Sequence, residues 1–97
     1  METKTKQATA TGVFVGGYTT FHCVTKDELA LFNEVQMPLG VDYQPVACAT
    51  QVVAGENYKF FCNAKVVAPD TPNEVAMVTI FRPLNGMPEL TNIERIG

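Results

Sequence analysis

The order of apolar and polar positions divides the chain into one short helical segment followed by several strands. Residues 24–36 carry the helical pattern. Thr25 and Glu28 have the spacing of a capping box, which predicts a helix that begins just after Thr25. The residue before Pro38 is biased away from helical geometry, so we expect about three helical turns. The residues at helical spacing that should form the apolar face are Leu29, Phe32 and Val35.

After the helical segment, apolar and polar residues alternate with the period of two that is typical of half-buried strands. Strands are predicted at residues 43–53, 58–67, 75–82 and 90–96. Ala54–Asn57 should form the hairpin tip between the first two. Phe61 alternates away from the helix-facing side, so we expect it on the outer face of the sheet, where a dimer partner could cover it. One helix followed by a meander of strands predicts an α+β fold.

Length and charge narrow the class of protein. The chain has 97 residues, which is enough for one domain, and a formal charge of −3. We expect a flexible tail over residues 1–11 and a single domain over residues 12–97. An acidic balance argues against a nucleic acid or a membrane as partner. A single histidine excludes metal sites that need two, and we expect no metal or other cofactor.

Three cysteines are an odd number, which suits a reducing compartment better than a disulfide framework. Their spacings match no zinc pattern. Around a tip centred near Gly55, Cys48 and Cys62 should be direct cross-strand neighbours. We expect two buried thiols there, with a disulfide as the alternative. No apolar run typical of a secretory signal is found near the start, so a cytoplasmic location is favoured unless a signal peptide has been removed.

An enzyme is one alternative to a binding domain. His22 and Cys23 are the only candidate base and thiol close together in the sequence. Neighbours on an extended chain point apart, so these two cannot form a catalytic pair. The sequence leaves open whether His22 meets Cys48 or Cys62 in space. We therefore predict that the protein is not an enzyme.

Three short segments carry the functional signal. Hairpin tips are normally polar, yet the predicted tip is entered through two valines and an alanine, at least one of which should face solvent or a partner. Paired glycines can mark a turn or a close backbone approach. The segments are Gln51-Val52-Val53-Ala54-Gly55, Gly16-Gly17 and Pro83-Leu84.

Together these segments resemble the cystatin family, which includes the stefins and inhibits papain-like cysteine proteases. The first segment is similar to the glutamine–valine–x–alanine–glycine hairpin of that family. Gly16 and Gly17 stand where the family has its N-terminal glycine, and Pro83-Leu84 stands where it has its second hairpin loop. The stretch from Gly17 to Gln51 is shorter than the family norm, which implies a shortened helix region.

The resemblance implies a cystatin-like fold with one short α-helix packed on a four- to five-stranded antiparallel sheet. It also implies a wedge that enters a protease cleft without offering a scissile bond. The residues expected to contact the protease are Gly16, Gly17, Gln51, Val52, Val53, Ala54, Gly55, Pro83 and Leu84. In the family, apolar residues ahead of the paired glycines would fill pockets of the cleft, and Val13–Val15 have that position. One alternative function stays open, a cystatin-fold module that binds another protein without inhibiting proteases. The oligomeric state also stays open, and the protein could be a monomer or a dimer.

Overall fold

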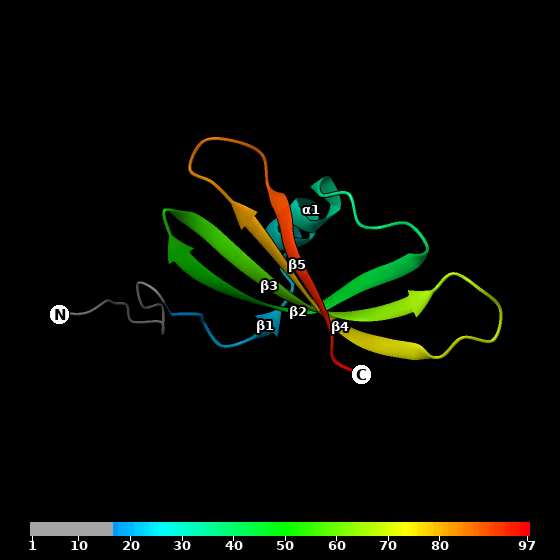
Figure 1. Ribbon diagram of the computed structural model, residues 1–97. Helices are drawn as coiled ribbons and strands as arrows, with labels where there is room; N and C mark the ends of the chain where they lie inside the picture. The colour runs from blue at the N-terminus through cyan, green and yellow to red at the C-terminus, as the bar shows by residue number, and fades with distance from the viewer. Residues whose placement is uncertain (1–16) are drawn as a thin grey trace.

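The computed structural model describes residues 17–97 (Figure 1). The predicted tail over residues 1–11, Val13–Val15 and Gly16 lie outside the described residues. The helix and strands, in chain order, are β1 (His22–Cys23), α1 (Lys26–Glu34), β2 (Val41–Val53), β3 (Gly55–Val66), β4 (Asn73–Arg82) and β5 (Glu89–Arg95). Within residues 17–97, no helix has the length and apolar character needed to span a membrane.

The strands form one antiparallel sheet in the order β1-β2-β3-β4-β5, so each strand pairs with its neighbour in sequence. Helix α1 lies between β1 and β2 in sequence and packs on one face of this sheet (Figure 1). One short helix on an antiparallel sheet is the predicted α+β arrangement, and β1 is a fifth strand beyond the four that the alternation of residues predicted.

The capping box predicted from the sequence is present at the start of α1. Thr25 is extended, its hydroxyl accepts a hydrogen bond from the backbone N–H of Glu28 at 3.2 Å, and the Glu28 carboxylate accepts one from the backbone N–H of Thr25 at 3.0 Å. Asp27 and Glu28 also place negative charge in the first turn, where the helix dipole favours it.

The apolar face of α1 differs from the predicted one. Leu31 and Phe32 are buried, whereas Leu29 is 42% exposed. The face toward the sheet follows the spacing i, i+3, i+4, i+7 from Glu28, so Leu29 lies about 100° away from Glu28 around the helix. Glu28, which is polar, therefore occupies a position on the inner face.

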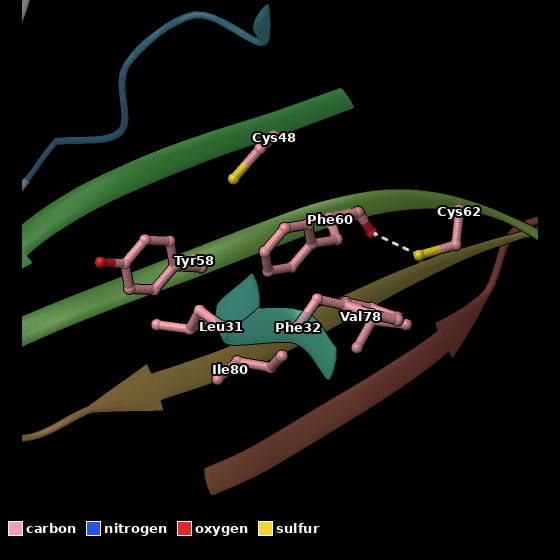
Figure 2. Packing of buried hydrophobic residues seen from close by; sticks show 8 residues of the cluster. All are labelled: Leu31, Phe32, Cys48, Tyr58, Phe60, Cys62, Val78 and Ile80. Carbon is pink, nitrogen blue, oxygen red and sulfur yellow. Dashed lines mark hydrogen bonds between the residues drawn. The ribbon is translucent and has the colours of Figure 1, made fainter. Parts of the chain in front are cut away.

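The core lies between α1 and the middle strands (Figure 2). The Phe32 ring meets the Phe60 ring edge to face at a centroid distance of 5.0 Å, and Tyr58 stacks against Phe60 at 6.2 Å. Alternation along β3 buries Phe60 completely and leaves its neighbour Phe61 37% exposed, as predicted for the outer face. The cluster comprises Leu31, Phe32, Cys48, Tyr58, Phe60, Cys62, Val78 and Ile80.

The predicted pairing of Cys48 with Cys62 is wrong. Cys48 lies opposite Phe60, and Cys62 lies opposite Pro45. The hairpin is centred on Ala54 rather than on Gly55, and the register shifts again between Pro45 and Ala47, where the bulge leaves Val46 exposed. Both cysteines are buried as free thiols, as expected, and they do not form the disulfide that was the alternative.

Candidate functional site

The described residues of the three segments singled out by the sequence lie at one end of the sheet. The β2–β3 tip, the β4–β5 loop and the chain that enters from the N-terminus all come to this end, while the β3–β4 connection lies at the opposite end (Figure 1). We call it the hairpin end. It comprises residues 17–18, 51–55 and 83–86.

The β2–β3 tip is tighter than the four residues predicted. Val53 pairs with Gly55, so Ala54 alone lies outside the ladder and β3 begins at Gly55. Gly55 has a φ of 116°, which side-chain-bearing residues rarely adopt. A Cβ at this position would overlap the carbonyl oxygen of Arg82 and lie 3.0 Å from the Cα of Pro83. Gly55 thus allows the tip to contact the start of the β4–β5 loop directly.

The chain that leads into β1 is held against β2. Tyr18 forms an isolated bridge with Gln51. The backbone N–H of Thr19 donates to the carbonyl of Thr50 at 2.8 Å, and the N–H of Thr50 donates back to the Thr19 hydroxyl at 3.0 Å. The ammonium of Lys59 stands 4.3 Å from the centroid of the Tyr18 ring. Gly17 is therefore positioned next to the base of the tip.

A polar network braces the hairpin end. The Tyr58 hydroxyl donates to the carboxylate oxygen Oε1 of Glu56 at 2.7 Å, and Arg82 Nη2 donates to the same oxygen at 3.2 Å. The Arg82 guanidinium also stands 5.5 Å from the centroid of the Tyr58 ring. Burial, followed by the hydrogen bond to Glu56, raises the pKa of Tyr58, so its hydroxyl stays protonated as the donor. These contacts hold β3 and β4 together where the two loops begin.

The exposed residues of the hairpin end are mostly apolar. Val52 is 40% exposed, Val53 is 38% exposed and Leu84 is 78% exposed. A hollow of about 370 Å³ lies between the two loops, lined by Gly55, Glu56, Arg82, Pro83, Leu84 and Gly86. Such a surface can bury apolar area in a concave partner.

A second polar group lies at the edge of the core, outside the hairpin end. His22 lies opposite Cys48 in the β1–β2 register, and its Nε2 is 2.7 Å from the Glu28 carboxylate oxygen Oε2. Burial alone would raise the pKa of Glu28, but the Thr25 N–H and His22 outweigh it and lower the pKa. Burial, with the nearby Glu28 carboxylate, raises the pKa of Cys48 to about 12. The thiol of Cys48 is thus protonated at neutral pH, which is unfavourable for a nucleophile.

The structure places Gly17, Gln51–Gly55, Pro83 and Leu84 together at the hairpin end, while Gly16 lies outside the described residues. Sequence reasoning missed the Glu56 and Arg82 pair, which lies 26 residues apart and has no sequence signature. It also left the partner of His22 open. The helical spacing of Glu28 with Leu31 and Phe32 was the signal that Glu28 faces the sheet.

No protein-family model, curated protein or solved structure matches this chain.

Proposed function

We propose that this protein is a cystatin-like inhibitor of papain-like cysteine proteases. The hairpin end would act as a wedge that fills the active-site cleft. The observation that carries the proposal is the meeting of Gly17, the Val52–Gly55 tip and Pro83-Leu84 at one end of the sheet. Residues 51–55 have a sequence similar to the family's first hairpin, and the other two segments stand at the positions where the resemblance places contact segments.

The chemistry of the wedge suits a blocking role. Val52, Val53 and Leu84 present apolar surface, and its removal from water contributes roughly 25 cal/mol per Å². The tip is tight and is braced by the Glu56 contacts with Tyr58 and Arg82, so little conformational entropy is lost on binding. Gly55 lets the tip lie directly against the start of the β4–β5 loop, so the two loops can present one surface to the cleft.

A titration against active-site-titrated papain, read with a fluorogenic peptide substrate, tests the proposal. We expect residual hydrolysis to fall linearly and to end near a one-to-one ratio. The inhibitor proposal fails if papain and related proteases keep full activity in a large excess of the protein. That outcome would favour the alternative, a cystatin-fold module that binds another protein.

A matched pair of substitutions locates the inhibitory surface. Val53→Asp buries a charge in the apolar contact and should weaken inhibition at least about tenfold. Val67→Asp makes the same chemical change at the opposite end of the sheet, where Val67 is 72% exposed, and should leave inhibition unchanged. Equal inhibition by the two variants would contradict a wedge at the hairpin end. Removal of residues 1–17 should also weaken inhibition, because it deletes Gly16 and Gly17.

A further inference from the structure

Three side chains with different donor atoms converge beside the core, away from the hairpin end. His22 comes from β1, Glu28 from α1 and Cys48 from β2. One ligand atom from each residue (a ring nitrogen, a carboxylate oxygen and Sγ) lies within 4.8 Å of the other two. Tetrahedral zinc with bonds of about 2.0–2.3 Å separates its ligand atoms by less than this.

The backbone fixes where these groups lie. The β1–β2 register sets His22 opposite Cys48. Glu28 occupies the same face of α1 as the buried Leu31 and Phe32, so its carboxylate is directed toward the sheet. Strand register and helix face thus bring the three side chains to the same side of the sheet.

His22 and Glu28 each have a second polar side-chain atom that already contacts a backbone group. His22 Nδ1 is 3.4 Å from the carbonyl oxygen of Thr20, and Glu28 Oε1 accepts the N–H of Thr25 at 3.0 Å. A histidine that binds a metal usually donates its second ring N–H to a carbonyl or carboxylate, which fixes the ring and its tautomer. His22 Nε2 and Glu28 Oε2 remain directed toward each other and toward Cys48.

We propose that His22, Glu28 and Cys48 form a binding site for Zn²⁺. Imidazole nitrogen, carboxylate oxygen and thiolate sulfur together suit Zn²⁺, whereas Mg²⁺ and Ca²⁺ prefer oxygen ligands alone. A zinc–sulfur bond forms as the Cys48 thiol proton leaves to solvent, and the ion replaces the direct contact between His22 and Glu28. Water completes the fourth position.

The exposure of the three residues indicates from which side the ion can enter the site from solvent. The side chain of His22 is 39% exposed and that of Glu28 is 13% exposed, while Cys48 is fully buried. The ion therefore reaches the thiol from the side of His22 and Glu28. Once bound, it links the two-residue strand β1 and the first turn of α1 to β2, and stabilises the folded state by mass action.

The full chain, reduced and freed of metal, tests this proposal by titration with Zn²⁺ and with Co²⁺. We expect one equivalent of Zn²⁺ to bind with a rise in the thermal midpoint, and Co²⁺ to give the near-ultraviolet charge-transfer band of a cobalt–thiolate bond. Absence of that band, or of any zinc-dependent change in the thermal midpoint, would overturn the proposal.

Four variants identify the ligands. His22→Asn and Glu28→Gln should each weaken Zn²⁺ binding at least about tenfold, and glutamine still fits a capping box, so the helix start is kept. Cys23→Ser removes the exposed thiol next to His22 and should leave the cobalt band intact. A cobalt band that survives in Cys48→Ser but disappears in Cys23→Ser would show that the exposed Cys23 thiol binds the metal. That result would overturn the assignment of Cys48 as a ligand. Neither result depends on protease inhibition.

Discussion

Gly55 combines a φ of 116° with a backbone neighbour on the side where a Cβ would project. Gly40 has a φ of 93° but no atom within 4 Å of a Cβ added there. Comparing the two glycines therefore distinguishes the free-energy cost of a positive φ from that of a steric overlap. At Gly40 only the backbone conformation opposes a side chain, whereas at Gly55 the contact with Arg82 opposes it as well.

Gly55→Ala should lower the free energy of unfolding by more than Gly40→Ala does. The positive φ costs about 1–2 kcal/mol in either variant, and the overlap with the Arg82 carbonyl adds to it only at Gly55. Urea unfolding of the two variants and of the unmodified protein measures the difference. Equal losses would mean that the tip and the β4–β5 loop do not contact each other at Gly55.

Strand β3 separates two environments by alternation along its length. Phe60 packs against Phe32 inside the core, whereas Phe61 faces outward on the other side of the sheet. Neighbouring positions with the same side chain thus differ mainly in burial. A one-residue change in register would exchange their roles.

Phe60→Ala should cost about 3–5 kcal/mol of stability, because it removes a fully buried ring and leaves a cavity. Phe61→Ala should cost at least about 2 kcal/mol less, since its ring is partly in water already. Chemical unfolding followed by far-ultraviolet circular dichroism measures both. Similar losses for the two variants would indicate that the outer face is covered, for example by a second copy of the chain.

The two buried cysteines of the core should make the folded protein less stable at alkaline pH. Burial raises the pKa of both Cys48 and Cys62 to about 12, in Cys48 with the Glu28 carboxylate adding to it. In the unfolded chain a thiol releases its proton near pH ~8.5. Above that pH the unfolded state binds fewer protons than the folded state. Stability therefore falls as pH rises from about 8.5 toward 12.

Under reducing conditions, the free energy of unfolding should fall by as much as about 1.4 kcal/mol per pH unit for each buried thiol above pH ~8.5. Cys62→Ala should make this decline shallower, even though it lowers stability at neutral pH. Urea unfolding at several values between pH ~7 and ~10 measures the slopes. An unchanged slope in Cys62→Ala would contradict the raised pKa of the buried Cys62 thiol.

The sequence by itself determined the elements that depend on local chemistry. Thr25 and Glu28 set the start of α1 because a capping box needs only residues three apart. Alternation along β3 set which face carries Phe60 and which carries Phe61. The motif at the β2–β3 tip likewise identified residues 51–55 as a candidate site before any contact was known.

Only the tertiary structure decided what depends on register and on distant contacts. The tip centred on Ala54 set Cys48 opposite Phe60, and the bulge at Val46 set Cys62 opposite Pro45, since each added or removed residue shifts every pair beyond it. The bond between Glu56 and Arg82 joins direct cross-strand partners of β3 and β4 that lie 26 residues apart in the sequence. His22, Glu28 and Cys48 meet because β1 pairs with β2 while α1 packs across the same face, a coincidence of three elements that no local pattern encodes.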